Sequence, residues 1–561
     1  MSAVGHSQIT QHYRLPPERP FLAGERSEVT ILLGGLTETH DRLIRAVFEG
    51  NGYRCQNLPT PDRADYQVGR EYGNLGQCNP TYFTAGNLVR FLRQLEAGGL
   101  SREEIARRYV FFTAGTCGPC RFGMYEAEYR MVLRRAGFDQ FRVLLFLQND
   151  GVRASSEPGL HFSLDFGLGM MNALQWGDAL QDLLRSIRPY ELTPGATDAA
   201  YEAALAELGR ELRERRSFDI TSKHSRWPQA WREARLVRSP VNTLGKLARH
   251  WRGEDTRRAL AAARARLAAV EVDRLRVRPV VKITGEFWAQ TTNGDGNFHL
   301  FSLLEREGAE VLLDPLANWV LYLLYQAQAE ARRARWLERG YGWGGDWQGI
   351  NQARRRLGVE WRSWTKAVLF GLASRLWTWQ YDFVRRALGG GHRLAPQAEL
   401  ARLAEPFYNP LARGGEGHLE VAKNLYYSRH RLAHMVLAIK PFGCMPSTQS
   451  DGVQAAVVRQ QRGVIFLSIE TAGEGEVHAH SRALMALGEA RQRARAEFNR
   501  ALQSTGRSLE EIRGFVAVHP PLRSALYPLP RVEGVAGMAA QFALHVSDLM
   551  AGRARLRKVA A

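Results

Sequence analysis

The chain has 561 residues, too many for one ordinary domain, and its length predicts two to four. Its composition, 45% hydrophobic and 24% charged, is that of a globular protein. No stretch reaches the roughly 18 consecutive apolar residues of a membrane-spanning helix, and the N-terminal segment MSAVGHSQITQHYRLPPERPF lacks the apolar core of a signal peptide. We therefore expect a cytoplasmic protein with no membrane partner.

The net charge of +19 comes mostly from arginine, which is spread through the predicted helices, as in RALAAARARLAAVEVDRLRVR. A basic chain can bind nucleic acid, but no lysine-rich tail, zinc finger or RNA-binding strand motif accompanies this charge. We do not expect a nucleic-acid partner. An acidic partner or an anionic ligand fits the charge better.

The first part of the chain alternates predicted strands and helices. The apolar run Val29–Leu33 ends at two glycines and is followed by a helix and a second strand. A strand at Tyr109–Thr113, the strand FRVLLFL and a helix around Leu168–Ile187 complete the pattern. This alternation predicts an α/β domain with a parallel sheet and helices on both faces.

A second α/β pattern begins at RPVVKITGEFWAQ, is interrupted by a tryptophan-rich helical stretch from Trp336 to about Leu388, and resumes at HRLAHMVLAIKPFGC. A segment of mostly charged helix separates the two α/β patterns. The predicted division of the chain is an N-terminal arm (1–26), a first α/β domain (27–190), a helical insert (191–276), a second α/β domain (277–504) and a C-terminal accessory segment (505–561).

Five cysteines are too few, and odd in number, for a disulfide framework. They are Cys55, Cys78, Cys117, Cys120 and Cys444. All but Cys55 lie in glycine- and proline-flanked loops that follow predicted strands and open helices. Ligands of open α/β sheets collect beyond the carboxyl ends of the strands, so these loops are expected to meet at one cleft.

The residues alone leave several interpretations of these cysteines open. Cys117-Gly-Pro-Cys120 matches the thioredoxin redox motif, but Thr116 stands where the usual tryptophan would be and no strand-like proline follows. Buried, inert thiols are a second interpretation, and the one we favour for Cys55. A structural zinc site is a third, although zinc prefers ligands close together in sequence.

Several other polar groups follow predicted strands. Glu286, Asn293 and Asn297 in TGEFWAQTTNGDGNFHL are candidates for hydrogen bonds to a ligand. The loop NPLARGGEGHLEVAKN contributes Gly414, Gly415 and Gly417 around Glu416, with His418 next. Glu470 and His434 are expected near the same cleft. The sequence identifies no general base.

Four segments together resemble a known bacterial family: GREYGNLGQCNPTYFTAGNLV, TCGPCRFGMYEAEYRMVLRRAGF, KPFGCMPSTQSDGVQAAV and IETAGEGEVHAHSRALMAL. In their order and spacing they look like the signatures of the family related to 2-hydroxyacyl-CoA dehydratases and their activases. The similarity extends from about Val29 to Leu502.

The resemblance implies two flavodoxin-like domains with a [4Fe–4S] cluster between them, held by Cys78, one or both of Cys117 and Cys120, and Cys444. Such clusters use three or four cysteines, and Cys120 is preferred over Cys117 if only one of them binds. In that family an ATPase partner of the actin/Hsp70 type drives a low-potential electron into the cluster and on to a substrate such as an acyl-CoA.

Many relatives carry the ATPase domain in the same chain, whereas this sequence has no phosphate loop of that type and no Walker motif. A separate activase is therefore the expected partner, with a small molecule as substrate. A thiol–disulfide oxidoreductase centred on Cys117 and Cys120, or a regulatory scaffold for an activase, are the alternatives, and the sequence does not decide whether the chain is itself an enzyme.

Overall fold

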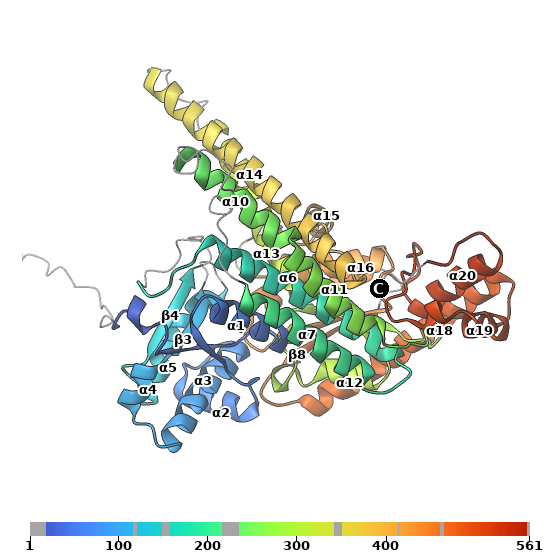
Figure 1. Cartoon of the computed structure of the whole chain (residues 1–561), viewed down its shortest axis with the longest axis horizontal. Helices are drawn as coiled ribbons and strands as arrows, with labels where there is room; N and C mark the ends of the chain where they lie inside the picture. The colour runs from blue at the N-terminus through green and yellow to red at the C-terminus, as the bar shows by residue number, and fades with distance from the viewer. Residues whose placement is uncertain are drawn as a thin grey trace, which may run out of the picture.

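The computed structural model describes residues 18–115, 120–147, 158–215, 235–340, 350–412, 415–460 and 465–557. In these residues the chain forms two four-stranded, all-parallel sheets with helices on both faces, which confirms the predicted α/β fold with two flavodoxin-like domains (Figure 1). No helix in the described ranges is long and apolar enough to cross a bilayer.

The first sheet has the strand order β2-β1-β3-β4. Its strands are β1 (Thr30–Leu33), β2 (Arg54–Asn57), β3 (Tyr109–Gly115) and β4 (Arg142–Leu147). Successive side chains of β1 point to opposite faces, as in any strand. Ile31 and Leu33 join the core under α1 (Glu38–Gly50) and α6 (Leu164–Ile187), whereas Leu32 joins the core under α3 (Asn79–Ala97) and α5 (Tyr125–Arg135). The short helices α2 (Arg63–Tyr72) and α4 (Arg102–Arg108) complete this second face.

The second sheet repeats the same topology in the order β6-β5-β7-β8. Its strands are β5 (Val280–Gly285), β6 (Glu310–Leu312), β7 (Met435–Pro441) and β8 (Ile465–Thr471). One face packs on α12 (Leu300–Arg306) and α18 (Glu476–Thr505), and the other on α16 (Gly417–Arg429). Strands β5 and β7 are buried along their whole length, although each contains one lysine, Lys282 and Lys440, which forms an ion pair with a buried acid.

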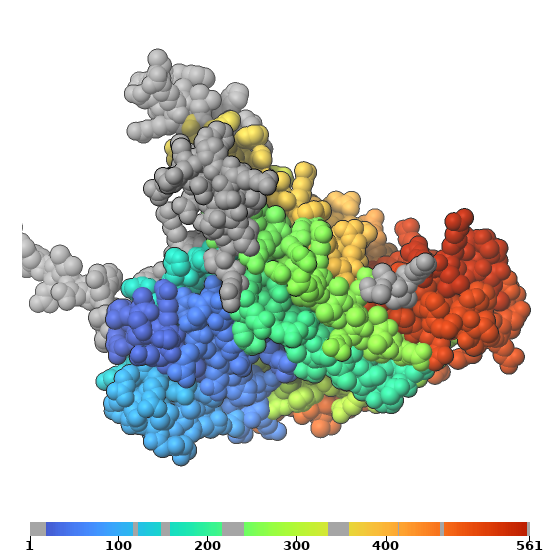
Figure 2. Space-filling view, in the orientation of Figure 1, coloured from blue at the N-terminus to red at the C-terminus, as the bar shows by residue number. Residues whose placement is uncertain are grey.

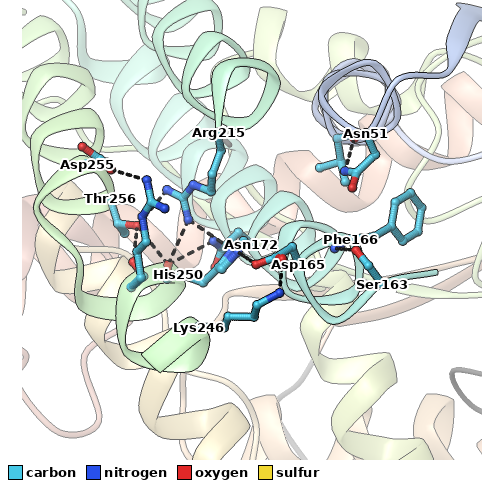
Figure 3. A network of polar contacts seen from close by, with 12 residues as sticks. Asn51, Ser163, Asp165, Phe166, Asn172, Arg215, Lys246, His250, Asp255 and Thr256 are labelled. Carbon is cyan, nitrogen blue, oxygen red and sulfur yellow. Dashed lines mark hydrogen bonds and ion pairs between the residues drawn. The ribbon is translucent and has the colours of Figure 1, made fainter. Parts of the chain in front are cut away.

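The helices that lie between the two α/β domains in the sequence pack on the core of the first domain. They are α7 (Ala196–Glu214), α10 (Arg235–Arg252) and α11 (Glu254–Ala268). Figure 3 shows how α10 is fixed to α6: Asp165 at the start of α6 forms an ion pair with Lys246 and lies 3.2 Å from the Nε2 atom of His250. Arg215 donates a hydrogen bond of 2.9 Å to the hydroxyl of Thr256 in α11.

The tryptophan-rich interruption is a helical hairpin, α13 (Leu316–Gly340) and α14 (Ile350–Leu388), and α14 extends well past the two sheets (Figure 1). After it come α15 (Gln397–Ala404), α16 and α17 (Met445–Gln460). The C-terminal helices α19 (Leu509–Ala517) and α20 (Met538–Met550) form a small core of their own with the end of α18. Figure 2 shows this segment, in red, at the opposite end of the molecule from the first domain, in blue.

The two domains meet through loops at the carboxyl ends of their strands. An aromatic cluster at the boundary contains Tyr66, Tyr82, Phe83 and Trp288. The ring centroids of Phe83 and Trp288 lie 5.4 Å apart. The side-chain amide of Asn79 donates a hydrogen bond of 2.5 Å to the carbonyl of Thr471. Apolar burial and buried hydrogen bonds thus hold the two strand ends against each other.

Candidate functional site: three cysteine loops at the domain boundary

Cys78 is the residue that caps the N-terminus of α3, with Pro80 in the first turn of the helix. Proline suits this position because the first N–H groups of a helix have no partner within it. The Cys78 side chain is buried. Its sulfur lies 3.0 Å from the hydroxyl of Tyr125 and 3.3 Å from that of Thr81, so two hydroxyl groups are within hydrogen-bonding distance.

Cys444 lies in the turn between β7 and α17, and this turn rests directly on Cys78. The backbone N–H of Asn79 donates a hydrogen bond of 3.2 Å to the carbonyl of Phe442. Gly443 adopts a φ of 78°, and a Cβ atom there would lie 3.4 Å from the Cα of Cys78. Glycine therefore allows both the left-handed turn and the close approach of the two loops.

Cys120 opens a short 3-10 helix, Arg121–Met124, that leads into α5. A Cβ atom at Gly415 would lie 3.8 Å from the Cβ of Cys120 and 2.4 Å from Pro446, so the loop before α16 touches both the Cys120 segment and the start of α17. Cys117 and Gly414 lie outside the described residues, so the structure does not place them.

The structure therefore brings the loops of Cys78, Cys120 and Cys444 to one place. Each sulfur also accepts a hydrogen bond from a backbone N–H a few residues further on: Thr81 for Cys78, Phe122 for Cys120 and Ser447 for Cys444. Such N–H···S bonds stabilise negative charge on sulfur. Cys55, by contrast, sits within β2 and pairs with Ile31, as its strand-like sequence predicts.

Cys78 and Cys444 are buried and Cys120 is half-buried, and this burial raises the pKa of each thiol. Burial, followed by the negative charge of Glu416, raises the pKa of Cys120 to about 12. Burial likewise raises the pKa of Cys78 and of Cys444. At neutral pH these groups are thus neutral thiols unless a cation replaces their protons.

Two buried carboxyl groups from the second domain face the cysteines. Glu286 follows β5, and its side chain accepts a hydrogen bond of 2.9 Å from the N–H of Ala289. Burial raises the pKa of Glu286 to about 7. Burial, and then the charge of Glu286, raises the pKa of Glu416 well above its usual value. Near neutral pH these two carboxyl groups therefore carry less negative charge than exposed carboxylates would.

Behind these carboxyls lies a buried network of paired charges. Asp314 accepts from the ammonium groups of Lys282 at 3.0 Å and Lys423 at 2.7 Å. Burial alone would raise the pKa of Asp314, but the two lysines lower it to about 2. Lys440 lies 3.4 Å from Glu420, which also accepts a hydrogen bond of 2.6 Å from Ser447, next to the Cys444 turn. The network fixes the strand ends that carry the site.

A small pocket opens beside Glu416 on the second domain. Its lining includes the rings of Phe287 and Trp319, the ammonium group of Lys423 and the amide of Gln290. The carbonyl oxygen of the Gln290 side chain is buried and has no hydrogen-bond partner among the described residues. The cavity offers only about 10 Å³, roughly the space of one water molecule, so it suits a water bound to the free acceptor of Gln290 rather than a substrate.

Within the described ranges, no three His, Cys, Asp or Glu side chains are grouped closely enough to bind a single metal ion. The donor set nevertheless fits a four-iron cluster, because each cysteine of such a cluster binds a different iron. Three thiols at helix starts, each with an N–H···S bond, supply the required ligand chemistry. The fourth candidate ligand, Cys117, falls in the part of the chain that is not described.

The other polar residues predicted from the sequence fall into two groups: some lie at the site, and others only hold the surrounding loops in shape. Glu286 and Glu416 lie at the site, with His418 two residues beyond Glu416. Asn297 is buried and donates to the carbonyl of Ala289, so it holds the loop in shape. Asn293 instead bonds Ser302 at the surface.

The expectation for His434 is wrong. Its Nδ1 atom accepts from the N–H of Val280, at the first residue of β5, so it lies at the amino ends of the strands, opposite the site. Glu470 lies near the end of β8, where its side chain is exposed.

Sequence reasoning missed Tyr125, although it lies in one of the four segments quoted above. No local sequence pattern indicates that a residue of one helix contacts a sulfur at the start of another helix. It also missed the Lys282–Asp314–Lys423 network. Lys282 interrupts an otherwise apolar strand, and this interruption was the available signal.

No protein family's sequence profile matches the chain, and no curated protein resembles it significantly.

Proposed function

We propose that this chain is an iron–sulfur protein of the 2-hydroxyacyl-CoA dehydratase-like type. In this proposal it binds one [4Fe–4S] cluster through Cys78, Cys120 and Cys444, with Cys117 as the candidate fourth ligand. It takes part in low-potential electron transfer to a small-molecule substrate, for which an acyl-CoA is the leading candidate. The proposal includes a cytoplasmic location, where thiols are kept reduced.

One observation carries the proposal: the turn holding Cys444 rests against Cys78 across the domain boundary, although the two residues come from opposite halves of the chain. Cysteines that bind nothing are not expected to cluster at the facing strand ends of two separate sheets. Metal-binding cysteines are expected to cluster there, because a site between two domains needs donors from both.

The residues around the sulfurs suit a buried redox centre. When bound, a [4Fe–4S] cluster supplies one-electron transfer at a potential set by its surroundings. The backbone N–H groups of Thr81, Phe122 and Ser447, and the hydroxyl of Tyr125, offset negative charge on sulfur. The raised pKa values of Glu286 and Glu416 limit the negative charge beside the sulfurs, and the aromatic cluster with Trp288 keeps the boundary dry.

The thiol–disulfide alternative is less well supported because it leaves two of the cysteine loops unexplained. In a Cys-X-X-Cys motif the first cysteine is the nucleophile and has the lowered pKa. That residue, Cys117, lies outside the described residues, so the raised pKa of Cys120 does not separate the two interpretations. A dithiol centre gives no reason for the Cys78 and Cys444 loops to meet beside it, whereas a cluster needs ligands from all of these loops.

The partner and the substrate are parts of the same proposal. The chain has no phosphate-binding loop for ATP, so the ATPase is expected to be a separate activase. The proposed place for the substrate is beside the cysteine loops at the domain boundary, because ligands of open α/β sheets collect beyond the carboxyl ends of the strands.

The test is iron and sulfide analysis of the anaerobically purified chain, followed by electron paramagnetic resonance after reduction. The wild-type chain is compared with Cys444→Ala and with Cys55→Ala, a matched removal of a thiol from β2. We expect iron and sulfide in a one-to-one ratio and a reduced-cluster signal, both retained in Cys55→Ala and lost in Cys444→Ala.

An iron-free chain that cannot be reconstituted with iron and sulfide would refute the proposal. So would iron that survives in Cys444→Ala. A bound cluster that no reductant or activase can reduce would instead support the regulatory-scaffold alternative.

A further inference from the structure

One face of α14 exposes a continuous row of large apolar side chains. The row consists of Trp361, Trp364, Val368, Leu369, Leu372, Leu376 and Trp379. Trp361 is 67% exposed, Leu369 63% and Leu372 52%. Spacings of three and four residues place these side chains on one side of the helix. The opposite side, with Trp377 and Tyr381, is buried against α13 and neighbouring elements.

This row is larger than an isolated protein usually exposes. At the side-chain areas typical of these residues, the exposed fractions amount to roughly 700–800 Å², above the ~300–600 Å² of the largest patch on a typical monomer. The value matches the ~800 Å² that each partner contributes to a stable protein–protein interface. At about 1.5 Å per residue, the row from Trp361 to Trp379 is ~27 Å long.

The row is also symmetric about its centre at Phe370. If a second copy of α14 runs antiparallel with Phe370 at the two-fold axis, Trp361 lies at the level of Trp379 of the second copy. Trp364 then lies at the level of Leu376, and Val368 at the level of Leu372. Apolar residues thus meet apolar residues along the whole row. A two-fold interface requires this self-complementarity, whereas a lipid surface or an unrelated partner does not.

Three exposed cations flank the row: Arg362, Lys366 and Arg375. In the antiparallel pair each lies eight or more positions, at least ~12 Å, from its own counterpart. However, Lys366 lies within one position of the level of Arg375 of the second copy. The cations therefore do not select the direction of the pair, which rests on the symmetry of the apolar row.

Figure 1 shows α14 extending well past the two sheets, so the sheets do not block the approach of a second copy. At its base, Arg252 of α10 lies 3.9 Å from the ring centroid of Trp379, which marks the end of the free row. Among the described residues, the ring of Trp361 stacks on that of Trp364 in the same row, with centroids 5.4 Å apart.

We infer that the chain forms a two-fold dimer in which the exposed row of α14 packs antiparallel against the same row of a second copy. Together with the two α13 helices this makes a four-helix bundle, in which helices cross at about 20° and apolar faces interdigitate. The inference does not depend on the proposed cluster, because the row lies outside the cysteine site.

The mass of the full chain in solution tests the inference, measured by light scattering behind size-exclusion chromatography. We expect twice the chain mass of 63.2 kDa for the wild type. Leu372→Glu, beside the two-fold axis, should give the single-chain mass with an unchanged melting temperature, because this side chain is half exposed. Met485→Glu, at an exposed apolar residue of α18, is the control and should remain dimeric.

Crosslinking tests the antiparallel register. Two copies of Leu369→Cys lie close to the axis, so a short thiol-reactive crosslinker should join them. In Leu376→Cys the two thiols are twelve positions apart, ~18 Å, and should not be joined.

A wild-type chain of single mass at tens of micromolar would overturn the inference, as would a Leu372→Glu chain that stays dimeric. Crosslinking of Leu376→Cys but not of Leu369→Cys would overturn the antiparallel register. A monomer that sediments with phosphatidylcholine–phosphatidylserine vesicles, and loses this binding in Leu372→Glu, would assign the row to lipid instead.

Discussion

The hydroxyl of Tyr125 lies 3.0 Å from the sulfur of Cys78, with both groups buried. A hydroxyl that donates to a cluster ligand stabilises the reduced, more negative state. Tyr125→Phe removes this bond and leaves the ring packing in place. We expect the midpoint potential to fall by about 40 mV, the equivalent of roughly 1 kcal/mol for a one-electron couple.

Redox titration followed by electron paramagnetic resonance measures this shift at equal iron content. Tyr129→Phe is a suitable control, because its hydroxyl bonds Thr84 rather than sulfur. An unchanged potential in Tyr125→Phe would mean that this hydroxyl has no influence on the redox centre.

Gly443 controls the contact between the two domains at the cysteines. Gly443→Ala forces a side chain into the left-handed region and places its Cβ 3.1 Å from the carbonyl of Gln77. The strain costs about 1–2 kcal/mol, and the crowding moves the Cys444 turn away from Cys78. We expect iron content to fall at least several-fold while the circular dichroism spectrum stays unchanged.

Gly475→Ala separates these two effects. Gly475 also has a positive φ, 98°, but its Cβ position is open. This variant should lose a similar amount of stability and keep its iron. Equal iron loss in both variants would show that backbone strain alone, and not the contact with Cys78, is responsible.

Trp288 anchors the boundary between the two sheets by packing on Phe83. Trp288→Ala removes a large buried ring and should destabilise the chain by about 3–5 kcal/mol. Because the lost contact lies between domains, we also expect a larger radius of gyration in X-ray scattering. Met485→Ala removes an exposed apolar side chain outside the α14 row and should leave chain stability nearly unchanged. Equal destabilisation by both variants would contradict this role for Trp288.

His418 makes stability depend on pH. It is buried beside Tyr322, and burial lowers its pKa from 6.5 to about 4. The folded chain therefore binds this proton less tightly than the unfolded chain, so the contribution of His418 is complete above pH 6.5 and is lost as the pH falls toward 4. At pH 5 the loss is about 2 kcal/mol.

Thermal unfolding at pH 7.5 and pH 5 checks this effect. The melting temperature of the wild type should fall more between the two values than that of His418→Gln, which has no charge to gain. An equal fall in both proteins would mean that His418 titrates normally in the fold.

The sequence predicts the framework of the site better than its chemistry. Pro80 and Pro446, next to Cys78 and Cys444, mark helix starts, and local preferences of this kind are visible in a single sequence. The repeated strand–helix alternation predicts two parallel sheets, and the shared strand order follows the rules of such folds.

The features of the site that could not be predicted from the sequence depend on contacts between residues far apart in the chain. That Gly443 lies on Cys78, or that Tyr125 reaches the same sulfur, depends on how two domains dock, and no local pattern encodes that arrangement. His434 was misplaced for a simpler reason. It precedes β7, and the residue before a parallel strand lies at the amino edge of the sheet, opposite the ligand edge.

The most direct measurement of the central claim is a crystal structure of the anaerobically prepared chain with anomalous data collected at the iron absorption edge. We predict one compact iron peak enclosed by the sulfurs of Cys78, Cys120 and Cys444, at the boundary between the two sheets. Iron located elsewhere, or a reconstituted chain whose three sulfurs surround no iron, would contradict it.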